Sequence, residues 1–167
     1  MDIYEEVFIN LWDCLNKNGV RYIMVGGFAT NLHGYQRFTE DVDLYLEDTP
    51  DNRKKLRKAF KELGLGDFEP IERIEFIPGW VDFQLDNGVR MDIMTSLKGV
   101  DLTFDECLQM APVAEIEHTY VPFLHINQLI DNKKAVNRPK DQSDVLELER
   151  IRKLSEQGGS KDSKTGL

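Results

Sequence analysis

The sequence predicts one domain of the α/β (α+β) class, in which helices and a sheet share a core. The chain has 167 residues, 41% of them hydrophobic, which fits a single soluble domain. Segments with helical spacing of apolar residues alternate with short strand-like segments, and no repeat or linker divides the chain. We predict a single domain over residues 1–157, with C-terminal helices over 126–157 that pack on the sheet. Residues 158–167, mostly Gly, Ser and Lys, are expected to form a disordered tail.

Charge and composition exclude several classes of protein. The net charge of -9 argues against broad binding to nucleic acid, which depends on Lys and Arg neutralising phosphates. No apolar run reaches the ~18 residues of a membrane span, and the acidic N-terminus lacks the basic start of a secretory signal. We therefore expect a cytoplasmic protein without a membrane partner. Cys14 and Cys107 lack metal-ligand spacing and are expected to be buried thiols.

The first part of the chain is predicted to form helix, strand and helix. Apolar residues at three- and four-residue spacing indicate a helix over residues 4–18, with Gly19 placed to end it. Residues 21–25 are a short strand that runs directly into Gly26-Gly27, and residues 28–33 are a short helix. A glycine pair between strand and helix lets the backbone approach an anion closely, although alone it also fits a tight turn.

A strand over residues 41–47 carries the central observation. Apolar and polar residues alternate strictly there, so Asp41 and Asp43 share one face, about 6–7 Å apart. Two carboxylates held so close repel each other unless a cation lies between them, and Mg²⁺ prefers oxygen ligands of this kind. The alternative is a solvated strand face, or a pair of acids that holds structural Ca²⁺.

Residues 80–94 resemble a β-hairpin around Asp86-Asn87-Gly88. A three-residue loop with Gly at its left-handed position places the apolar residues of both strands on one face, whereas a two-residue Asn-Gly turn would mix the faces. We prefer the three-residue loop, which puts Asp92 on the polar face opposite Asp82. Asp92 is the candidate third carboxylate, with Asp82 as its substitute, and three acids could hold two metal ions about 3.5–4 Å apart.

The remaining elements follow from capping and turn signals. They are a helix opened by Thr49-Pro50 and ended at Gly64, a helix started by the capping box Thr103–Glu106, a strand over 120–124, and helices over 126–136 and 141–154.

Together these motifs resemble the DNA polymerase β-like nucleotidyltransferase superfamily. Val25-Gly26-Gly27 is followed after 13 residues by Asp41-Val42-Asp43-Leu44, as in the signature of that superfamily. The stretches 26–44 and 132–141 are similar to a small bacterial branch that includes abortive-infection toxin nucleotidyltransferases. The likeness spans roughly residues 20–150.

The resemblance implies a fold, a reaction and ligands. The fold is a mixed sheet with helices packed mainly on one face. The reaction moves a nucleoside monophosphate from a nucleoside triphosphate (NTP) to an acceptor, with two Mg²⁺ or Mn²⁺ ions held by Asp41, Asp43 and Asp92. Many members have Ser where this chain has Gly27, which keeps open a silent module that binds nucleotide or metal without turnover.

Cations near both motifs are candidates for binding the nucleotide. A stretch of eight residues holds four cations, Lys133, Lys134, Arg138 and Lys140, although the chain as a whole is net negative. Such a cluster suits a triphosphate or a nucleic-acid acceptor, although cations also favour helix ends. Lys133 and Arg138 are preferred because they match the family stretch. Arg37 and Thr39 either contact phosphate, which we favour for Arg37, or order the loop. Gly26 and Gly27 complete the predicted nucleotide-binding residues.

The acceptor is left open by the sequence. A tRNA end or other RNA, a protein hydroxyl and a small molecule such as an aminoglycoside all fit this core. The branch that the chain resembles also suggests the toxin of a toxin–antitoxin pair, with an antitoxin as partner.

Overall fold

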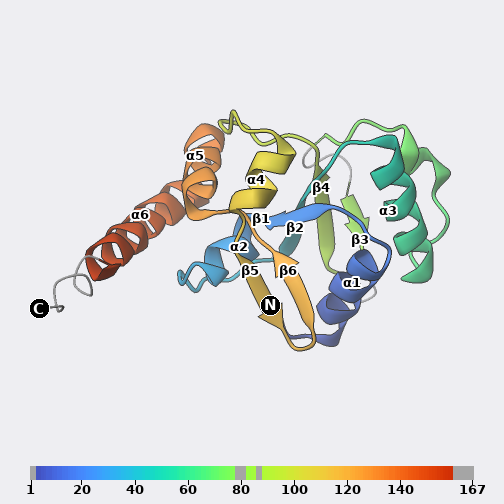
Figure 1. The fold of residues 1–167 in the computed structure, drawn as a ribbon, viewed down its shortest axis with the longest axis horizontal. Helices are drawn as coiled ribbons and strands as arrows, with labels where there is room; N and C mark the ends of the chain where they lie inside the picture. The colour runs from blue at the N-terminus through green and yellow to red at the C-terminus, as the bar shows by residue number, and fades with distance from the viewer. Residues whose placement is uncertain (1–2, 78–81, 86–87, 160–167) are drawn as a thin grey trace, which may run out of the picture.

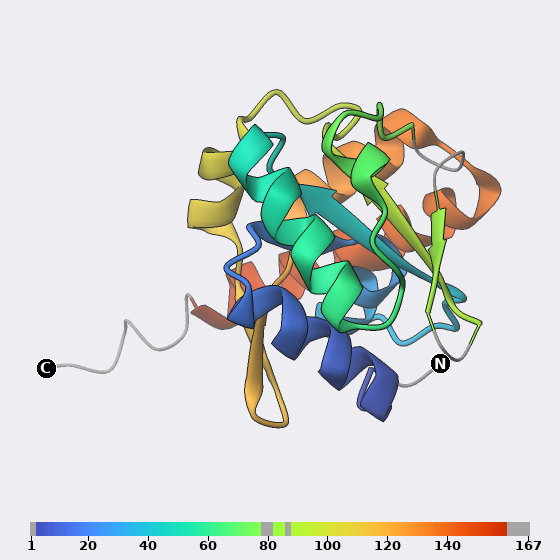
Figure 2. The same cartoon turned by 90° about the vertical axis from the view of Figure 1, so that its right-hand side faces the viewer.

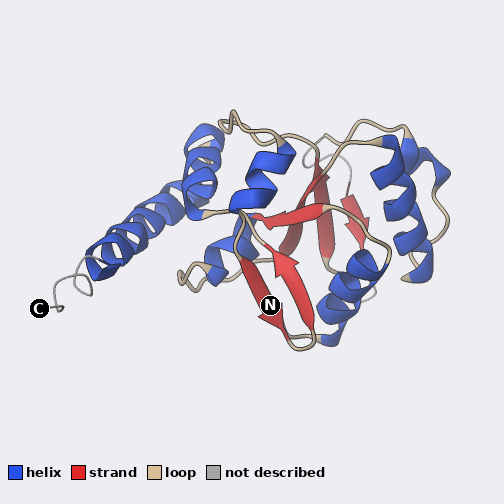
Figure 3. Ribbon diagram, viewed as in Figure 1, coloured by secondary structure: helices blue, strands red, loops and turns tan. Residues whose placement is uncertain are grey.

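A mixed β-sheet with helices around it forms the centre of the protein, as Figures 1 and 3 show. The structure is a computed structural model that describes residues 3–77, 82–85 and 88–159. The described elements are, in chain order, α1 (Glu6–Lys17), β1 (Tyr22–Val25), α2 (Gly26–Leu32), β2 (Asp41–Leu46), α3 (Pro50–Glu62), the 3-10 helix η1 (Glu69–Glu72), β3 (Asp82–Gln84), β4 (Arg90–Met94), α4 (Phe104–Met110), β5 (Val113–Ile116), β6 (Thr119–Pro122), α5 (Ile126–Val136) and α6 (Pro139–Gly159).

The main sheet has the strand order β1-β2-β4-β3. β2 runs parallel to β4, and the pairs β1–β2 and β3–β4 are antiparallel, so the predicted mixed sheet is confirmed. β5 and β6 form a separate two-stranded sheet. α1 and α3 lie side by side against one face of the main sheet, while α5 and α6 pack together at its other side (Figure 2). Over the ranges that the structure describes, no helix is long and apolar enough to cross a membrane.

α1 packs on the sheet because its apolar residues fall on one side of the helix. Phe8, Leu11, Trp12 and Leu15 are all fully buried, at the three- and four-residue spacing that the sequence shows. Gly19 follows the helix with a φ of 66°, a left-handed conformation that ends a helix at little cost for glycine. The predicted helix and its stop are confirmed.

β2 has the predicted alternation with one exception. Val42, Leu44 and Leu46 are fully buried, and Asp41 and Asp43 lie on the other face, only partly covered. Tyr45 follows Asp41 and Asp43 on the same face by the strand period but is only 6% exposed, since its ring packs edge-on against Phe104 of α4 at 5.1 Å. α4 therefore covers one end of the polar face, and the aspartates lie at the open end.

The register of the β3–β4 hairpin is the predicted one. Asp82 lies opposite Asp92 and Gln84 opposite Arg90, while Leu85 N–H donates to the carbonyl of Val89. Gly88 has a φ of 80°, as the three-residue loop requires. Asp86, Asn87 and Trp80 lie outside the described residues.

Side-chain caps explain where α3, α4 and α5 begin. The Thr49 hydroxyl accepts from the backbone N–H of Asn52, and Thr103 and Glu106 form the predicted capping box. α5 has the predicted bounds and ends at Asn137, whose φ is 58°.

Several elements differ from the sequence prediction: α2 begins at Gly26 and not at residue 28, and β6 covers Thr119–Pro122 and not residues 120–124. α6 begins at Pro139, two residues earlier than expected, because Pro is well suited to a first turn; it runs to Gly159. η1 and β5 were not predicted. β5 contains Ala114 and Glu115, which are poor strand formers, and it is held by pairing with β6. Residues 160–167, the remainder of the expected tail, lie outside the described residues.

Candidate active site

Aspartates gather on one face of the main sheet, which we call the acid face: Asp41, Asp43, Asp82 and Asp92. Asp43 on β2 lies directly opposite Asp92 on β4, and Asp92 lies opposite Asp82 on β3. Asp41 shares the face of Asp43 because the two are separated by a single residue of one strand. Strand pairing thus brings the predicted acids together.

Gly26 and Gly27, the first two residues of α2, form the glycine turn of the site and lie against these acids. Gly26 has a φ of 65°, and a Cβ atom there would overlap the carboxylate of Asp43. A Cβ on Gly27 would overlap the side chain of Thr39 and lie 3.3 Å from Arg37 Nη1. Glycine at both positions is therefore a steric requirement of this site, and the space of a side chain at residue 27 is filled by Thr39.

The carboxylates of the acid face are not fully neutralised by the cations near them. Burial, followed by the charges of Asp92 and Asp41, raises the pKa of Asp43 to about 6. Burial also raises the pKa of Asp92, against the effect of nearby Arg90. Oδ1 of Asp92 is buried without a hydrogen-bond partner among the described residues. A buried, unpartnered carboxylate oxygen is costly, so this arrangement favours a bound cation.

The donor set fits a divalent cation, although its side chains are not turned to hold one. Among the described residues, no group of three or more His, Cys, Asp or Glu is arranged to bind a metal ion. Oδ2 of Asp41 instead accepts from Arg90 Nη2 at 3.2 Å. The donors are carboxylate oxygens, the ligands that Mg²⁺ and Mn²⁺ prefer, and the unpartnered oxygen of Asp92 is available to such an ion.

An ion-pair network stands across from the acid face and ties the chain segments of the site together. Arg37, before β2, donates from Nε and Nη2 to Asp144 of α6 at 2.7 and 2.8 Å. Lys133 of α5 donates to Asp144 at 2.7 Å and lies 3.6 Å from Asp141. Arg138 pairs with Asp141 at 2.8 Å. We call these five residues the ion network; its interior members Lys133, Asp141 and Asp144 are almost fully buried.

All the predicted site residues line one cavity of about 530 Å³. Its lining comes from the glycine turn, the segment before β2, the acid face, the chain after β4 and the α5–α6 junction. The lining residues are Val25, Gly26, Gly27, Arg37, Phe38, Thr39, Glu40, Asp41, Asp43, Arg90, Asp92, Met94, Ser96, Lys98, Asn132, Lys133, Val136, Arg138, Lys140 and Asp141.

Several residues of this cavity were not predicted to belong to the site. Arg90 could have been found, because the hairpin register places it on the face of Asp92; its position opposite Asp41 depends on the pairing of β2 with β4. Phe38 and Lys98 carry no local sequence signal for this role. Lys98 reaches the cavity because its carbonyl accepts from Asn132 on α5 at 2.9 Å, a contact that depends on the tertiary fold.

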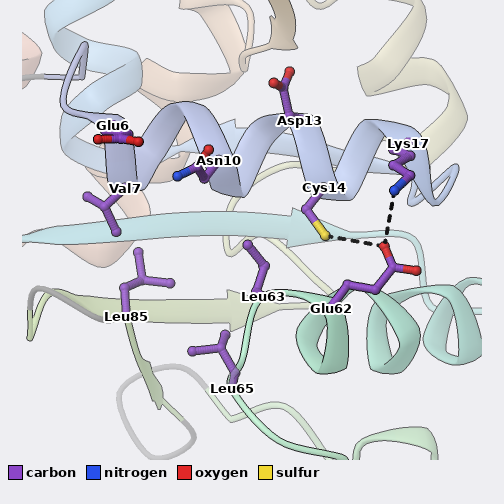
Figure 4. Close-up of a pocket in the computed structure, with 10 residues that line it drawn as sticks. All are labelled: Glu6, Val7, Asn10, Asp13, Cys14, Lys17, Glu62, Leu63, Leu65 and Leu85. Carbon is purple, nitrogen blue, oxygen red and sulfur yellow. Dashed lines mark hydrogen bonds and ion pairs between the residues drawn. The ribbon is translucent and has the colours of Figure 1, made fainter.

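A second cavity, of about 570 Å³, lies between α1, the end of α3 and Leu85 of the hairpin, as Figure 4 shows. Its lining combines the apolar side chains of Val7, Leu63, Leu65 and Leu85 with acidic and basic side chains such as Glu62 and Lys17. Cys14 there donates to the carbonyl of Ala59, and burial first of all raises the pKa of its thiol, so the thiolate is disfavoured. This cavity has neither a glycine turn nor paired aspartates facing a basic cluster, and we do not assign the chemistry to it.

The three histidines of the chain have structural contacts outside the acid face. His33 Nε2 lies 2.8 Å from the carbonyl of Leu124, and His125 caps α5. His118 pairs with Asp13. Trp12 is in the core. Both cysteines are free thiols; Cys107 is buried as expected, whereas Cys14 is only partly buried because it lines the second cavity.

A mixed sheet with a glycine turn against paired strand aspartates defines the nucleotidyltransferase class. A family model described as "Nucleotidyl transferase of unknown function (DUF2204)" matches residues 4–162, so the chain belongs to this family of nucleotidyltransferases. No curated protein matches the sequence significantly.

Solved structures share the fold at low sequence identity. The lincosamide antibiotic adenylyltransferase LnuA, in a lincomycin-bound structure, has a TM-score of 0.58 and 14% identity over 88% of this chain and 97% of its own. ANT(2")-Ia in complex with adenylyl-2"-tobramycin has a TM-score of 0.56 and 16% identity, over 89% of this chain and 87% of its own. TM1012 from Thermotoga maritima, a candidate nucleotidyltransferase, has a TM-score of 0.52 and 13% identity. The match covers 96% of this chain and 94% of TM1012.

Proposed function

We propose that this nucleotidyltransferase moves a nucleoside monophosphate from an NTP to an acceptor hydroxyl, with two Mg²⁺ or Mn²⁺ ions held by Asp41, Asp43 and Asp92. The observation that carries the proposal is the pairing of Asp43 with Asp92, where a carboxylate with a raised pKa lies beside one with an unpartnered oxygen. Such groups are stabilised by a cation and destabilised without one. Bound metal ions would neutralise phosphate charge and support an in-line displacement at the α-phosphorus.

The chain's own residues would bind and orient the triphosphate. Backbone N–H groups at Gly26 and Gly27 can approach the phosphates closely because neither residue carries a side chain. Arg37 and Thr39 border this turn, so we propose that Thr39 contacts phosphate and that Arg37 fixes the loop and contributes charge. In the reaction, the acceptor oxygen forms a bond to the α-phosphorus as the bond to pyrophosphate breaks, and the acceptor hydroxyl loses its proton.

Lys133 and Arg138 would act on the outer phosphates to different extents. The Arg138 side chain is 58% exposed and can turn to a ligand while it keeps one contact to Asp141. The Lys133 side chain is 4% exposed and already paired with Asp144, so we propose that its charge acts at the cavity wall and that it also stabilises the fold. Replacing Lys133 by Ala should therefore lower stability as well as affinity.

An acceptor hydroxyl on RNA, on a protein or on a small molecule is compatible with this cavity. Two of the solved structures named above, LnuA and ANT(2")-Ia, contain antibiotic ligands, which favours a test that includes small molecules. A toxin role with an antitoxin partner, and a cytoplasmic location, belong to the same proposal and rest on the sequence resemblance.

Labelling with α-³²P-NTPs tests the function and the acceptor together. The protein is incubated with each NTP, Mg²⁺ or Mn²⁺ and a total lysate, which is then separated into RNA, protein and small-molecule fractions. We expect label in one fraction, and background label with the Asp41→Asn/Asp43→Asn variant or with EDTA. Arg73→Gln, at a surface pair with Glu69 and outside the cavity lining, is the matched control and should label normally.

Two results would contradict the proposal in different ways. Metal-dependent NTP binding in calorimetry without label transfer to any fraction would identify a silent nucleotide-binding module. Equal labelling by the parent and the double variant would place the chemistry outside the acid face.

A further inference from the structure

Arg90 is the single arginine on the acid face among the described residues, and it contacts two of its carboxylates. It lies directly opposite Asp41 in the parallel pair of β2 and β4. Its Nη2 lies 3.2 Å from Asp41 Oδ2, and its Nε lies 3.5 Å from Asp82 Oδ2. The guanidinium thus bridges Asp41 and Asp82.

This bridge divides the acid face into two unequal halves. Asp41 and Asp82 share the positive charge of Arg90. Arg90 makes no such ion pair with Asp43 or Asp92, and Oδ1 of Asp92 is buried without a hydrogen-bond partner among the described residues. A first cation is therefore expected at Asp43 and Asp92, whose carboxylates form no ion pair with Arg90, while Asp41 is already engaged.

We propose that Arg90 is a displaceable counter-ion, which holds Asp41 while the site is empty and turns to the phosphates of the nucleotide once a metal ion takes Asp41. This inference rests on the proposed function. A guanidinium and a divalent cation compete for the same carboxylate, and the cation then repels the guanidinium. A planar guanidinium also suits phosphate oxygens, which it can contact with two parallel hydrogen bonds.

The position of Arg90 allows this exchange without backbone movement. Its backbone is fixed between β2 and β3 by its pairing with Asp41 and Gln84. Its side chain is 49% exposed and lines the same cavity as the glycine turn. Only side-chain torsions need to change, and an exposed ion pair of this length is weak enough to exchange.

The proposal predicts effects of opposite sign on two ligands. Arg90→Gln removes the competitor for Asp41, so Mn²⁺ titrated without nucleotide should bind about fivefold more tightly. The same variant loses a charge-assisted contact to phosphate, so at saturating Mn²⁺ the affinity for a non-hydrolysable NTP should fall about tenfold or more. A merely structural role would weaken both.

Isothermal calorimetry measures both affinities on the full chain, with circular dichroism to establish folding. Arg90→Lys keeps the charge but cannot bridge two carboxylates as a guanidinium does, so its Mn²⁺ affinity should lie between those of the parent and Arg90→Gln. This variant keeps the test decisive if the glutamine variant folds poorly. Arg73→Gln is the matched control and should change neither affinity.

The outcomes separate this inference from the proposed function. Mn²⁺ binding that is unchanged or weaker in Arg90→Gln, with a parent that binds Mn²⁺, overturns the role of Arg90 alone. A parent that binds no Mn²⁺ overturns the metal site and Arg90 with it.

Discussion

Removing the charge of Asp144 gives the sharpest test of how the site is assembled. Asp144 is fully buried on α6 and accepts from both Arg37 and Lys133 at 2.7–2.8 Å. Asp144→Asn keeps the shape of the side chain and leaves two cations near a neutral amide. Breaking a buried ion pair by removing one partner costs about 3–5 kcal/mol, because a buried charge is left uncompensated.

The structure places the expected loss near the lower end of that range. Lys133 retains Asp141 at 3.6 Å, and the Arg37 side chain is 19% exposed, so water can solvate part of its charge. For a domain of this size, each kcal/mol corresponds to about 2–4 °C. The melting temperature of Asp144→Asn should therefore fall by about 6–12 °C.

Thermal and urea unfolding followed by circular dichroism measure this loss. The matched control is Glu147→Gln on the same helix, where a surface pair with Arg150 should contribute less than about 1 kcal/mol. If Asp144→Asn and Glu147→Gln shift the melting temperature equally, or if Asp144→Asn stabilises the protein, the ion network does not hold the site together.

Further predictions concern the acid face and the glycine turn. Because the folded state raises the pKa of Asp43 to about 6 from about 4 in the unfolded chain, this group should make metal-free protein less stable as the pH rises from about 4 to 6. Asp43→Asn should remove that part of the slope in melting curves with EDTA, and parallel curves for the two proteins would contradict it. Gly26→Ala should cost about 1–2 kcal/mol from its left-handed backbone alone and should also abolish Mn²⁺ binding by displacing Asp43; a variant with parental stability and Mn²⁺ affinity would refute the steric role. Gly27→Ser should lower the melting temperature through its collision with Thr39, and adding Thr39→Gly should recover part of the loss in a double-mutant cycle, whereas additive losses would argue against the collision.

The arrangement of the acids could be predicted because it follows from local periodicity. Alternation in β2 fixed the shared face of Asp41 and Asp43, and the choice of a three-residue hairpin loop fixed the face of Asp92. Both depend on the two-residue period of a strand. The observed register bears out this geometry, while the chemical roles of these residues stay predictions.

The partners of the cations could not be read from the sequence. Lys133 and Arg138 were chosen as part of a basic cluster, yet Asp141 and Asp144 fold back beside them because Asn137 turns the chain sharply between α5 and α6. The pair of Arg37 with Asp144 joins residues 107 positions apart. Such pairings depend on how helices pack on the sheet, which hydrophobic periodicity does not specify.

The register of the main sheet has a consequence for protein engineering. Val25, Asp43, Asp92 and Asp82 stand in one row across four neighbouring strands. Their mutual spacing is therefore set by the inter-strand repeat of about 4.8 Å, and the packing of the core beneath has little influence on it. Core residues such as Val42 and Leu44 could be redesigned extensively while the acids keep their positions. An insertion of a single residue between Asp41 and Asp43 would instead place their two carboxylates on opposite faces of the sheet.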